Sequence, residues 1–107
     1  MRKAEIFVHG ELAGHLLELE TNTSYRYRFQ YLDQYDGALV SLTMPIEQRT
    51  FEYDRFPPFF EGLLPEGIML EGLLRQLKID AKDYFAQLMA TGRDLVGAVT
   101  VKAVKDE

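Results

Sequence analysis

The sequence contains no cysteine and no tryptophan among its 107 residues. The absence of cysteine excludes disulfides, thiolate metal ligands and cysteine nucleophiles, and it fits a reducing compartment. Basic residues are also in the minority, because 12 Lys and Arg stand against 17 Asp and Glu, which gives a formal net charge of −5. Such a surface repels phosphate backbones and anionic lipids, so we expect no direct nucleic-acid or membrane partner.

Long apolar runs are missing as well. No stretch is long enough to cross a membrane, and Glu5 and His9 interrupt the apolar region that a secretion signal would need after Met1. Hydrophobic residues nevertheless make up 47% of the chain and charged residues 27%, which is typical of a globular protein. We therefore expect residues 1–107 to form a single domain located in the cytoplasm.

Strands are expected in the first half of the chain. Residues 4–8 and 12–19 are apolar and β-favouring on either side of a turn at Gly10, which is typical of a hairpin. Residues 25–31 alternate strictly and place four aromatic side chains on one face. Residues 39–44 alternate more weakly and end before a proline, which predicts a fourth strand.

Helices are expected in the second half. Pro57 and Pro58 can open a short helical turn, and Pro65 with Glu66 predicts the start of a second helix with a carboxylate in its first turn. Asp80 is the expected N-cap of a third helix that ends at Gly92. The second helix carries an apolar stripe made of Leu70, Leu73, Leu74 and Leu77. The third helix carries an inward face made of Phe85, Leu88 and Met89.

Residues 97–104 predict one closing strand after the helices. Strands followed by helices and a single last strand indicate the α+β class rather than alternating βαβ units. We expect a small antiparallel, β-rich sheet or barrel-like domain, with two to three helices in its C-terminal half.

Residues 92–95 superficially match the catalytic loop of protein kinases. That loop requires an asparagine for the second magnesium ion where this chain has Val99, and the chain has no glycine-rich phosphate loop. His9 and His15 flank the hairpin turn without the spacing of a metal site or an adjacent nucleophile. The sequence therefore predicts no catalytic residue, no metal site and no cofactor.

The region after residue 56 is the densest apolar segment of the chain. It consists of Phe56, Phe59, Phe60, Leu63, Leu64, Ile68 and Met69. Most of it is expected to be core, and any part that the few helices leave uncovered would form an interaction patch. Glu61 and Glu66 border this segment, but the intervening proline fixes no common geometry for an acid and base pair.

Two motifs carry a resemblance to a known family. The nine residues from Phe59 to Gly67 resemble the signature of the HipA amino-terminal subdomain, and the residues from Gly92 to Val99 resemble its second block at the expected distance. Weaker similarity lies in residues 8–16 and 39–45, so that the resemblance covers roughly Ile6 to Val101. It implies a β-rich fold with a few helices, packed in full-length HipA proteins beside a kinase core.

The resemblance also implies a function. The family's ATP-binding and catalytic residues lie outside the matched region, so none is carried over to this chain. A stand-alone copy of the subdomain resembles HipS, the antitoxin of tripartite HipBST toxin-antitoxin systems in bacteria, which binds and inhibits the separate serine/threonine kinase HipT. Family members often carry a tryptophan after the first motif, where this chain has Ile68.

We therefore expect a non-enzymatic, antitoxin-like subunit that binds a HipA-like kinase (HipT), with a helix-turn-helix HipB-like protein as a further partner in a ternary complex. The alternatives are a structural subdomain of a fused HipA kinase and a single-stranded nucleic-acid-binding domain that uses residues 25–31. The expected partner-binding residues are Phe59, Phe60, Glu61, Leu63, Leu64, Glu66, Ile68, Met69, Arg93 and Asp94.

Overall fold

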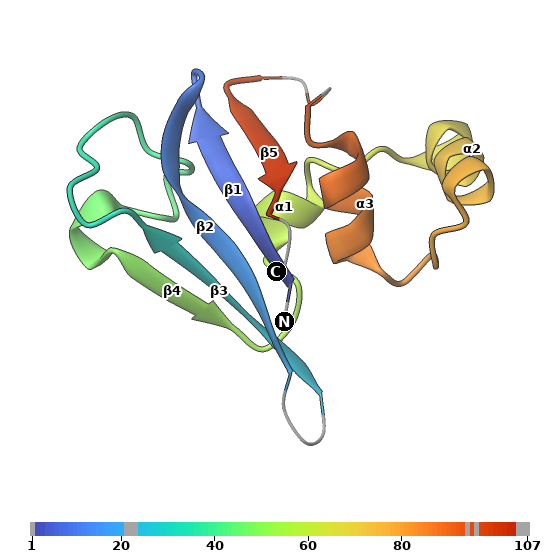
Figure 1. Ribbon diagram of the computed structural model, residues 1–107, viewed down its shortest axis with the longest axis horizontal. Helices are drawn as coiled ribbons and strands as arrows, with labels where there is room; N and C mark the ends of the chain where they lie inside the picture. The colour runs from blue at the N-terminus through green and yellow to red at the C-terminus, as the bar shows by residue number, and fades with distance from the viewer. Residues whose placement is uncertain (1, 21–23, 94, 96, 105–107) are drawn as a thin grey trace.

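The computed structural model describes residues 2–20, 24–93, 95 and 97–104, and in these residues it contains five strands, three α-helices and one short 3-10 helix (Figure 1). In chain order they are β1 (Arg2–Val8), β2 (Glu11–Glu20), β3 (Tyr25–Tyr31), η1 (Ile46–Gln48), β4 (Thr50–Tyr53), α1 (Pro58–Glu61), α2 (Gly67–Leu77), α3 (Tyr84–Thr91) and β5 (Val99–Ala103). None of the described helices combines the length and apolar character that crossing a bilayer requires. The α+β class is confirmed.

The strands form one open antiparallel sheet in the order β4-β3-β2-β1-β5. β1 and β2 make the expected hairpin, with Val8 opposite Glu11. Its register shifts between Ile6 and Phe7, where Ala13 is an extra residue on β2. The expected closing strand is β5, which pairs with β1 and leaves β4 and β5 as the two edges.

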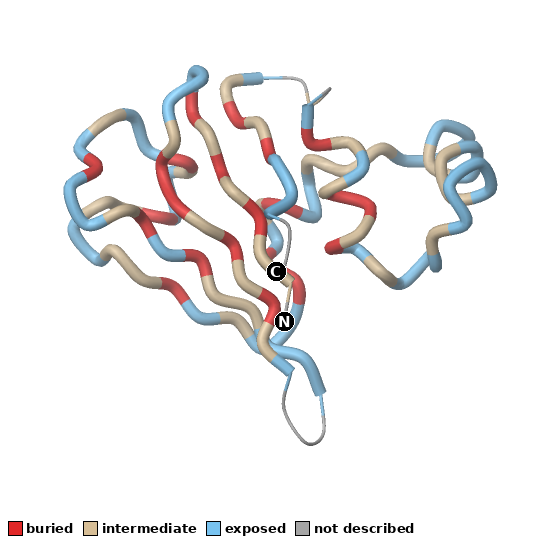
Figure 2. Tube along the Cα trace, viewed as in Figure 1, coloured by how far each residue is buried: buried red, intermediate tan, exposed pale blue. Residues whose placement is uncertain are grey.

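The core lies on one face of the sheet, under α1 and α3 (Figure 2). Strand residues that point to this face alternate with half-buried residues on the other face, as the burial of β1 shows. In the aromatic strand Phe29 and Tyr31 are buried, whereas Tyr25 is 51% exposed. Fully buried side chains come from both layers: Ile6, Leu16 and Phe29 from the strands, and Phe60, Phe85 and Leu88 from the helices.

The predicted strand at residues 39–44 is wrong, since this segment forms no strand and the fourth strand is β4, farther along the chain. The alternation has another cause. The Tyr31 hydroxyl accepts a hydrogen bond from Val40 N–H (3.0 Å) and donates one to the Met44 carbonyl (2.6 Å), so both residues are drawn into the core. Leu42 lies between them at the tip of a turn and is 91% exposed.

Two helix starts also differ from the prediction. α2 begins at Gly67, and Glu66 is its N-cap residue instead of a first-turn carboxylate. The N-cap of α3 is Asp83, whose side chain accepts a hydrogen bond from a backbone N–H three residues later (3.1 Å). Asp80 accepts from Lys82 N–H (2.7 Å) in the loop before the helix. Helix α3 was therefore predicted in the right place, but with the wrong N-cap residue.

Candidate protein-interaction surface

The candidate surface begins at α1, a single turn that sets the direction of the two leucines after it. Pro58 opens the helix, where its ring pre-sets the backbone angle φ. Phe60 is fully buried and packs its ring on Phe29, with 6.0 Å between the ring centroids, which fastens the turn to the sheet. Leu63 and Leu64 continue the turn, because each donates its N–H to the carbonyl three residues earlier (3.1 Å for both).

An apolar groove of about 500 Å³ opens where these leucines meet α2 and the end of α3. We call it the leucine groove. It is lined by Gly62, Leu63, Leu64, Pro65, Met69, Leu73, Thr91 and Leu95. Its walls thus come from three segments that are up to 33 positions apart in sequence, and nearly all of its side chains are apolar, so it can accept apolar side chains of another protein.

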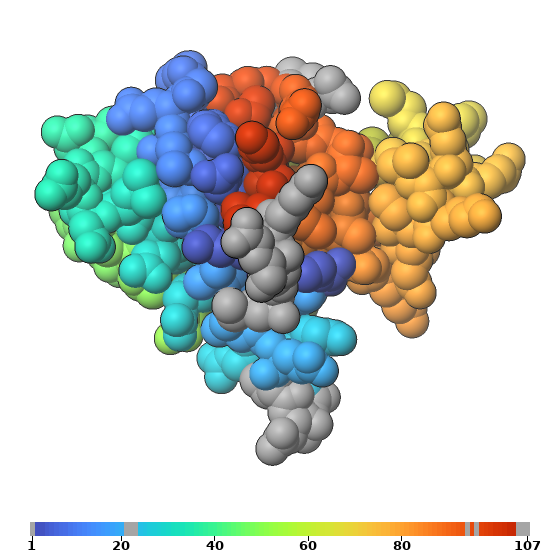
Figure 3. Space-filling model, in the orientation of Figure 1, coloured from blue at the N-terminus to red at the C-terminus, as the bar shows by residue number. Residues whose placement is uncertain are grey.

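Helix α2 protrudes at one end of the molecule (Figure 3). None of its eleven residues, all of them described, is buried. Its expected apolar stripe is only half-covered, Leu77 at its end is 49% exposed, and in its first turn Ile68 and Met69 are 86% and 76% exposed. Gly67 enters the helix with a φ of +61°, a value that favours glycine. Large apolar side chains exposed side by side on one helix are typical of a surface that a partner covers.

A charged network fixes α3, which forms the third wall of the groove. Arg2 donates two hydrogen bonds to the carboxylate of Glu18 (2.7 Å each) and two to that of Asp83 (2.8 and 3.1 Å). Its guanidinium also lies 5.1 Å from the centroid of the Phe85 ring. Since Glu18 belongs to β2 and Asp83 caps α3, Arg2 ties the start of this helix to the sheet.

The same network shifts the pKa values of its members. Burial alone would raise the pKa of Asp83, but the hydrogen bonds from Arg2 and from the backbone outweigh it, and the pKa lies below its ordinary value. Burial, together with the negative charge of Glu18, raises the pKa of Tyr27 to about 12. The tyrosine therefore stays neutral and donates a hydrogen bond to Glu18 (3.3 Å).

The structure brings only some of the predicted partner-binding residues together. Leu63, Leu64 and Met69 line the leucine groove, and Ile68 is exposed beside it on α2. Phe59 is half-buried and lines a second, separate hollow. Three further predicted residues, Glu61, Glu66 and Arg93, are exposed; Phe60 is buried and supports the surface from beneath; Asp94 lies outside the described residues.

Sequence reasoning missed part of the groove wall. Leu73 was predicted only as part of the apolar stripe of its helix, and neither Thr91 nor Leu95 was singled out as a contact residue. The only signal for Leu95 was its place in the second motif, two positions after Arg93. Thr91 carries no signal of its own, because it reaches the groove only through the packing of α3 on the sheet.

Other candidate sites are less well supported. Arg26 and Arg28, the basic side chains of the aromatic strand, pair with Asp54 (3.3 Å) and Glu52 (3.0 Å), which lowers their capacity to attract phosphates. His15 lies on β2, where burial and the neighbouring charge of Lys3 lower its pKa. Within the described residues no group of three or more His, Asp or Glu side chains is arranged to hold a metal ion.

Comparisons with known proteins agree with this geometry. Residues 4–102 match the family described as the HipA N-terminal domain. A Haemophilus influenzae protein is 33% identical over 105 residues, which cover 98% of this chain and 95% of that protein. A Sinorhizobium fredii protein with the name "Putative kinase Y4dM" is 29% identical over 104 residues, which cover 91% of this chain but only 25% of that protein.

A solved structure described as the N-terminal domain of HipA toxin has the same fold, with a TM-score of 0.77 and 29% sequence identity. The alignment covers 100% of this chain and 96% of the solved one. Sequence and fold therefore point to one family across nearly the whole length, and the chain belongs to the HipA N-terminal domain family.

Proposed function

We propose that this chain is a HipS-like regulatory subunit, without catalytic activity of its own, that binds and inhibits a separately encoded HipA-like kinase (HipT). One observation carries the proposal. The leucine groove lies beside the first turn of α2, where Ile68 and Met69 are 86% and 76% exposed. A partner that covers this surface removes both side chains from water, which is the contribution expected of anchor residues at the centre of an interface.

The comparisons support a kinase as the partner. In the Sinorhizobium protein that is named a putative kinase, the region similar to this chain is 25% of the whole, so the domain is joined there to a much larger body. The Haemophilus protein, by contrast, is matched over 95% of its length and consists of little else. Relatives of this domain thus occur both as part of a larger protein and as a protein of about this size. The second arrangement is the one that docking in trans requires.

The fused relative also supports a second function, that of a structural subdomain without inhibitory activity in trans. The two functions differ in the genes that encode them. A stop codon after Glu107 followed by a separate kinase-core reading frame favours the regulatory subunit, and a continuous frame favours the subdomain. A helix-turn-helix, HipB-like protein encoded beside them would be the expected third member of the complex.

The direct test is co-expression with the HipA-like kinase core encoded in the same genome. We expect a stable complex on size-exclusion chromatography, restored growth of cells that express the kinase, and loss of phosphoryl transfer by the purified kinase. Separate elution and unrelieved toxicity would contradict the proposal. A complex in which the kinase stays fully active would favour the structural subdomain.

A matched pair of variants then locates the contact. Replacing Ile68 and Met69 by serine removes two apolar anchors and should weaken kinase binding by about tenfold or more. Because both side chains are largely exposed, the unfolding free energy should change by no more than about 0.5 kcal/mol. Tyr25→Ser is the control, since it removes another exposed apolar side chain at the start of β3, away from α2 (Figure 1). Equal weakening by the control would contradict the placement of the contact.

A further inference from the structure

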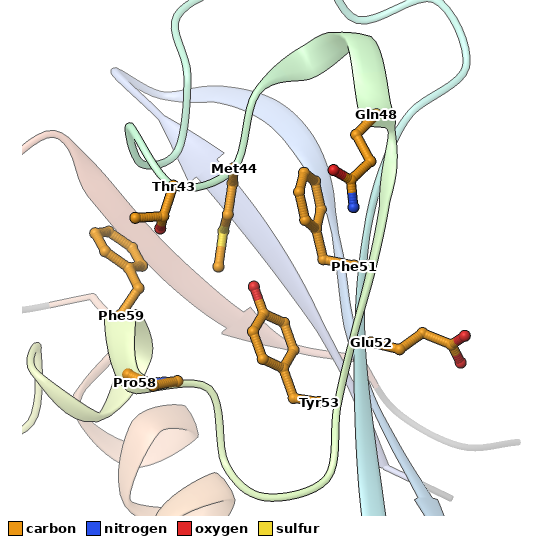
Figure 4. A pocket seen from close by; sticks show the side chains of 8 residues that line it. All are labelled: Thr43, Met44, Gln48, Phe51, Glu52, Tyr53, Pro58 and Phe59. Carbon is orange, nitrogen blue, oxygen red and sulfur yellow. The ribbon is translucent and has the colours of Figure 1, made fainter.

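A second hollow of about 450 Å³ is lined in part by α1, whereas the leucine groove is lined by the residues that follow this helix. We call it the β4 hollow. It is lined by Thr43, Met44, Gln48, Phe51, Glu52, Tyr53, Pro58 and Phe59 (Figure 4). Met44 and Phe51 are buried at its floor, at 1% and 7% exposure, whereas Phe59 and Tyr53 form half-buried walls. The hollow can accept one apolar side chain.

Tyr53 adds a polar group to these apolar walls. Its hydroxyl points into the hollow toward Met44 (Figure 4), and within the described part of the chain it makes no hydrogen bond. Burial raises the pKa of Tyr53, so the phenol stays protonated and can donate. A backbone carbonyl beside the inserted side chain is the acceptor that this geometry suits.

Leu42 directly precedes Thr43 and Met44, two of the residues that line the hollow. Its turn is closed by a hydrogen bond from Met44 N–H to the Ser41 carbonyl (2.9 Å) and by one from Thr43 N–H to the Ser41 hydroxyl (3.2 Å). The Tyr31 hydroxyl holds both ends of the turn to the core. Leu42 is thus 91% exposed on a backbone that is already ordered, so its contact with a partner costs little conformational entropy.

β4 forms one wall of the hollow and is an edge strand, which pairs on one side with β3. Tyr31 N–H donates to the Arg49 carbonyl (2.9 Å), and the alternation of an antiparallel ladder then turns the backbone groups of Glu52 away from β3. An edge strand with outward-facing N–H and C=O groups can pair with an extended segment of another chain. Such a segment would run past the hollow.

We propose that the β4 hollow is a second docking site for the same kinase partner, which inserts an apolar side chain of an extended segment there and receives Leu42 in return. The inference rests on the proposed function. α1 connects the two sites, because Phe59 lines the β4 hollow and Leu63 and Leu64 line the leucine groove. A partner that covers α1 and the residues after it therefore reaches both sites. In the Sinorhizobium protein named a putative kinase, the similar region is 25% of the whole, so the remainder is large enough for such a contact.

Titration calorimetry with the HipA-like kinase core of the same genome tests this site. Leu42→Ser should weaken binding about tenfold, and Tyr53→Phe, which removes one hydrogen bond and keeps the ring, about three- to tenfold. Leu39→Ser is the control, because Leu39 is an exposed leucine of the same loop and, unlike Leu42, is not next in sequence to a residue that lines the hollow. It should change the affinity less than twofold, and all variants should melt like the wild type.

The outcomes separate the two proposals. Wild-type binding that neither Leu42→Ser nor Tyr53→Phe weakens would overturn the second site and leave the proposed function intact. Absence of binding by the wild type would overturn both. Sedimentation of the chain alone as a dimer that Leu42→Ser dissociates, with unchanged kinase affinity, would assign the hollow to a second copy of this chain and also overturn the proposal.

Discussion

Arg2 shows how one side chain near the start of the chain organises elements that are distant in sequence. Glu18 is only 6% exposed, and a carboxylate at such a position is stable only if its charge is compensated. Arg2 supplies that compensation and uses its remaining donors for Asp83, the cap of α3. The exposed pairs of Arg26 and Arg28 have no such role, and pairs of that kind contribute on the order of 0.5 kcal/mol each.

Asp83 gives a prediction on pH dependence. Its pKa is lower in the folded than in the unfolded protein, so its contribution to stability is present above the unfolded pKa of about 4 and is lost as the pH falls through the folded value. Asp83→Asn keeps an N-cap side chain but loses the ion pair, which is partly exposed to solvent. We expect it to lower the unfolding free energy by about 1 kcal/mol at pH 7. The difference from the wild type should shrink below about pH 4.

Urea denaturation at pH 7 and at about pH 3 measures this difference. Asp80→Asn is the control, because Asp80 lies in the same region and hydrogen-bonds to a backbone N–H but not to Arg2. Its unfolding free energy should stay within about 0.5 kcal/mol of the wild type at both pH values. A loss for Asp83→Asn that is the same at both pH values would show that capping, and not the charge pair, is what the carboxylate contributes.

At the scale of elements, the sequence predicted most strands and helices because their periodicity matches their burial. The hairpin, the aromatic strand and the inward face of α3 follow directly from this. The two strand errors have different causes. A hydrogen-bonded turn around Tyr31 gives residues 39–44 the alternation of a strand, whereas the four residues of β4 are too few to show a pattern. The turn cannot be predicted without knowing which residues the tyrosine hydroxyl reaches.

α2 is the element whose stability depends least on the core. Because none of its residues is buried, we expect its amides to exchange with solvent much faster than those of α3, which buries Phe85 and Leu88. Gly72→Ala should slow this exchange, since alanine favours a helix interior by about 1 kcal/mol over glycine and its methyl group would meet no neighbour within 4 Å.

Hydrogen-exchange mass spectrometry measures both effects. Gly62→Ala is the control, because a methyl group there makes only ordinary contacts and the residue lies outside α2. Equal exchange of α2 and α3 in the wild type would mean that α2 unfolds only together with the core.

At the scale of the whole molecule, the fold has one core, and α1 with the residues that follow it lines both the β4 hollow and the leucine groove. The first family motif predicted the region correctly as apolar, and it led to Leu63, Leu64 and Met69 of the groove wall. It gave no sign that Phe59 and Leu63 face different hollows, because that depends on how the single turn of α1 is oriented on the sheet. The walls from α3 depend in turn on the Arg2 network.

The proposed complex with a HipA-like kinase should therefore show protection from exchange in two separate regions of this chain. We expect exchange to slow in α2 and in the turn at residues 41–44, and to stay unchanged in the turn at Gly10 at the far end of the β1–β2 hairpin, which serves as an internal control (Figure 1). Hydrogen exchange of the free and bound chain checks this expectation. Protection confined to α2 would restrict the interface to the leucine groove.

Tyr31 is part of the core and also holds the turn that exposes Leu42. Its ring packs against Tyr35 and Phe29 at centroid distances of 5.7 and 4.8 Å, while its hydroxyl holds Val40 and Met44. Replacing Tyr31 by phenylalanine would preserve the aromatic packing and unfasten the turn. A substitution in the core of this domain can therefore change its affinity for a partner protein, even when every residue at the contact surface stays the same.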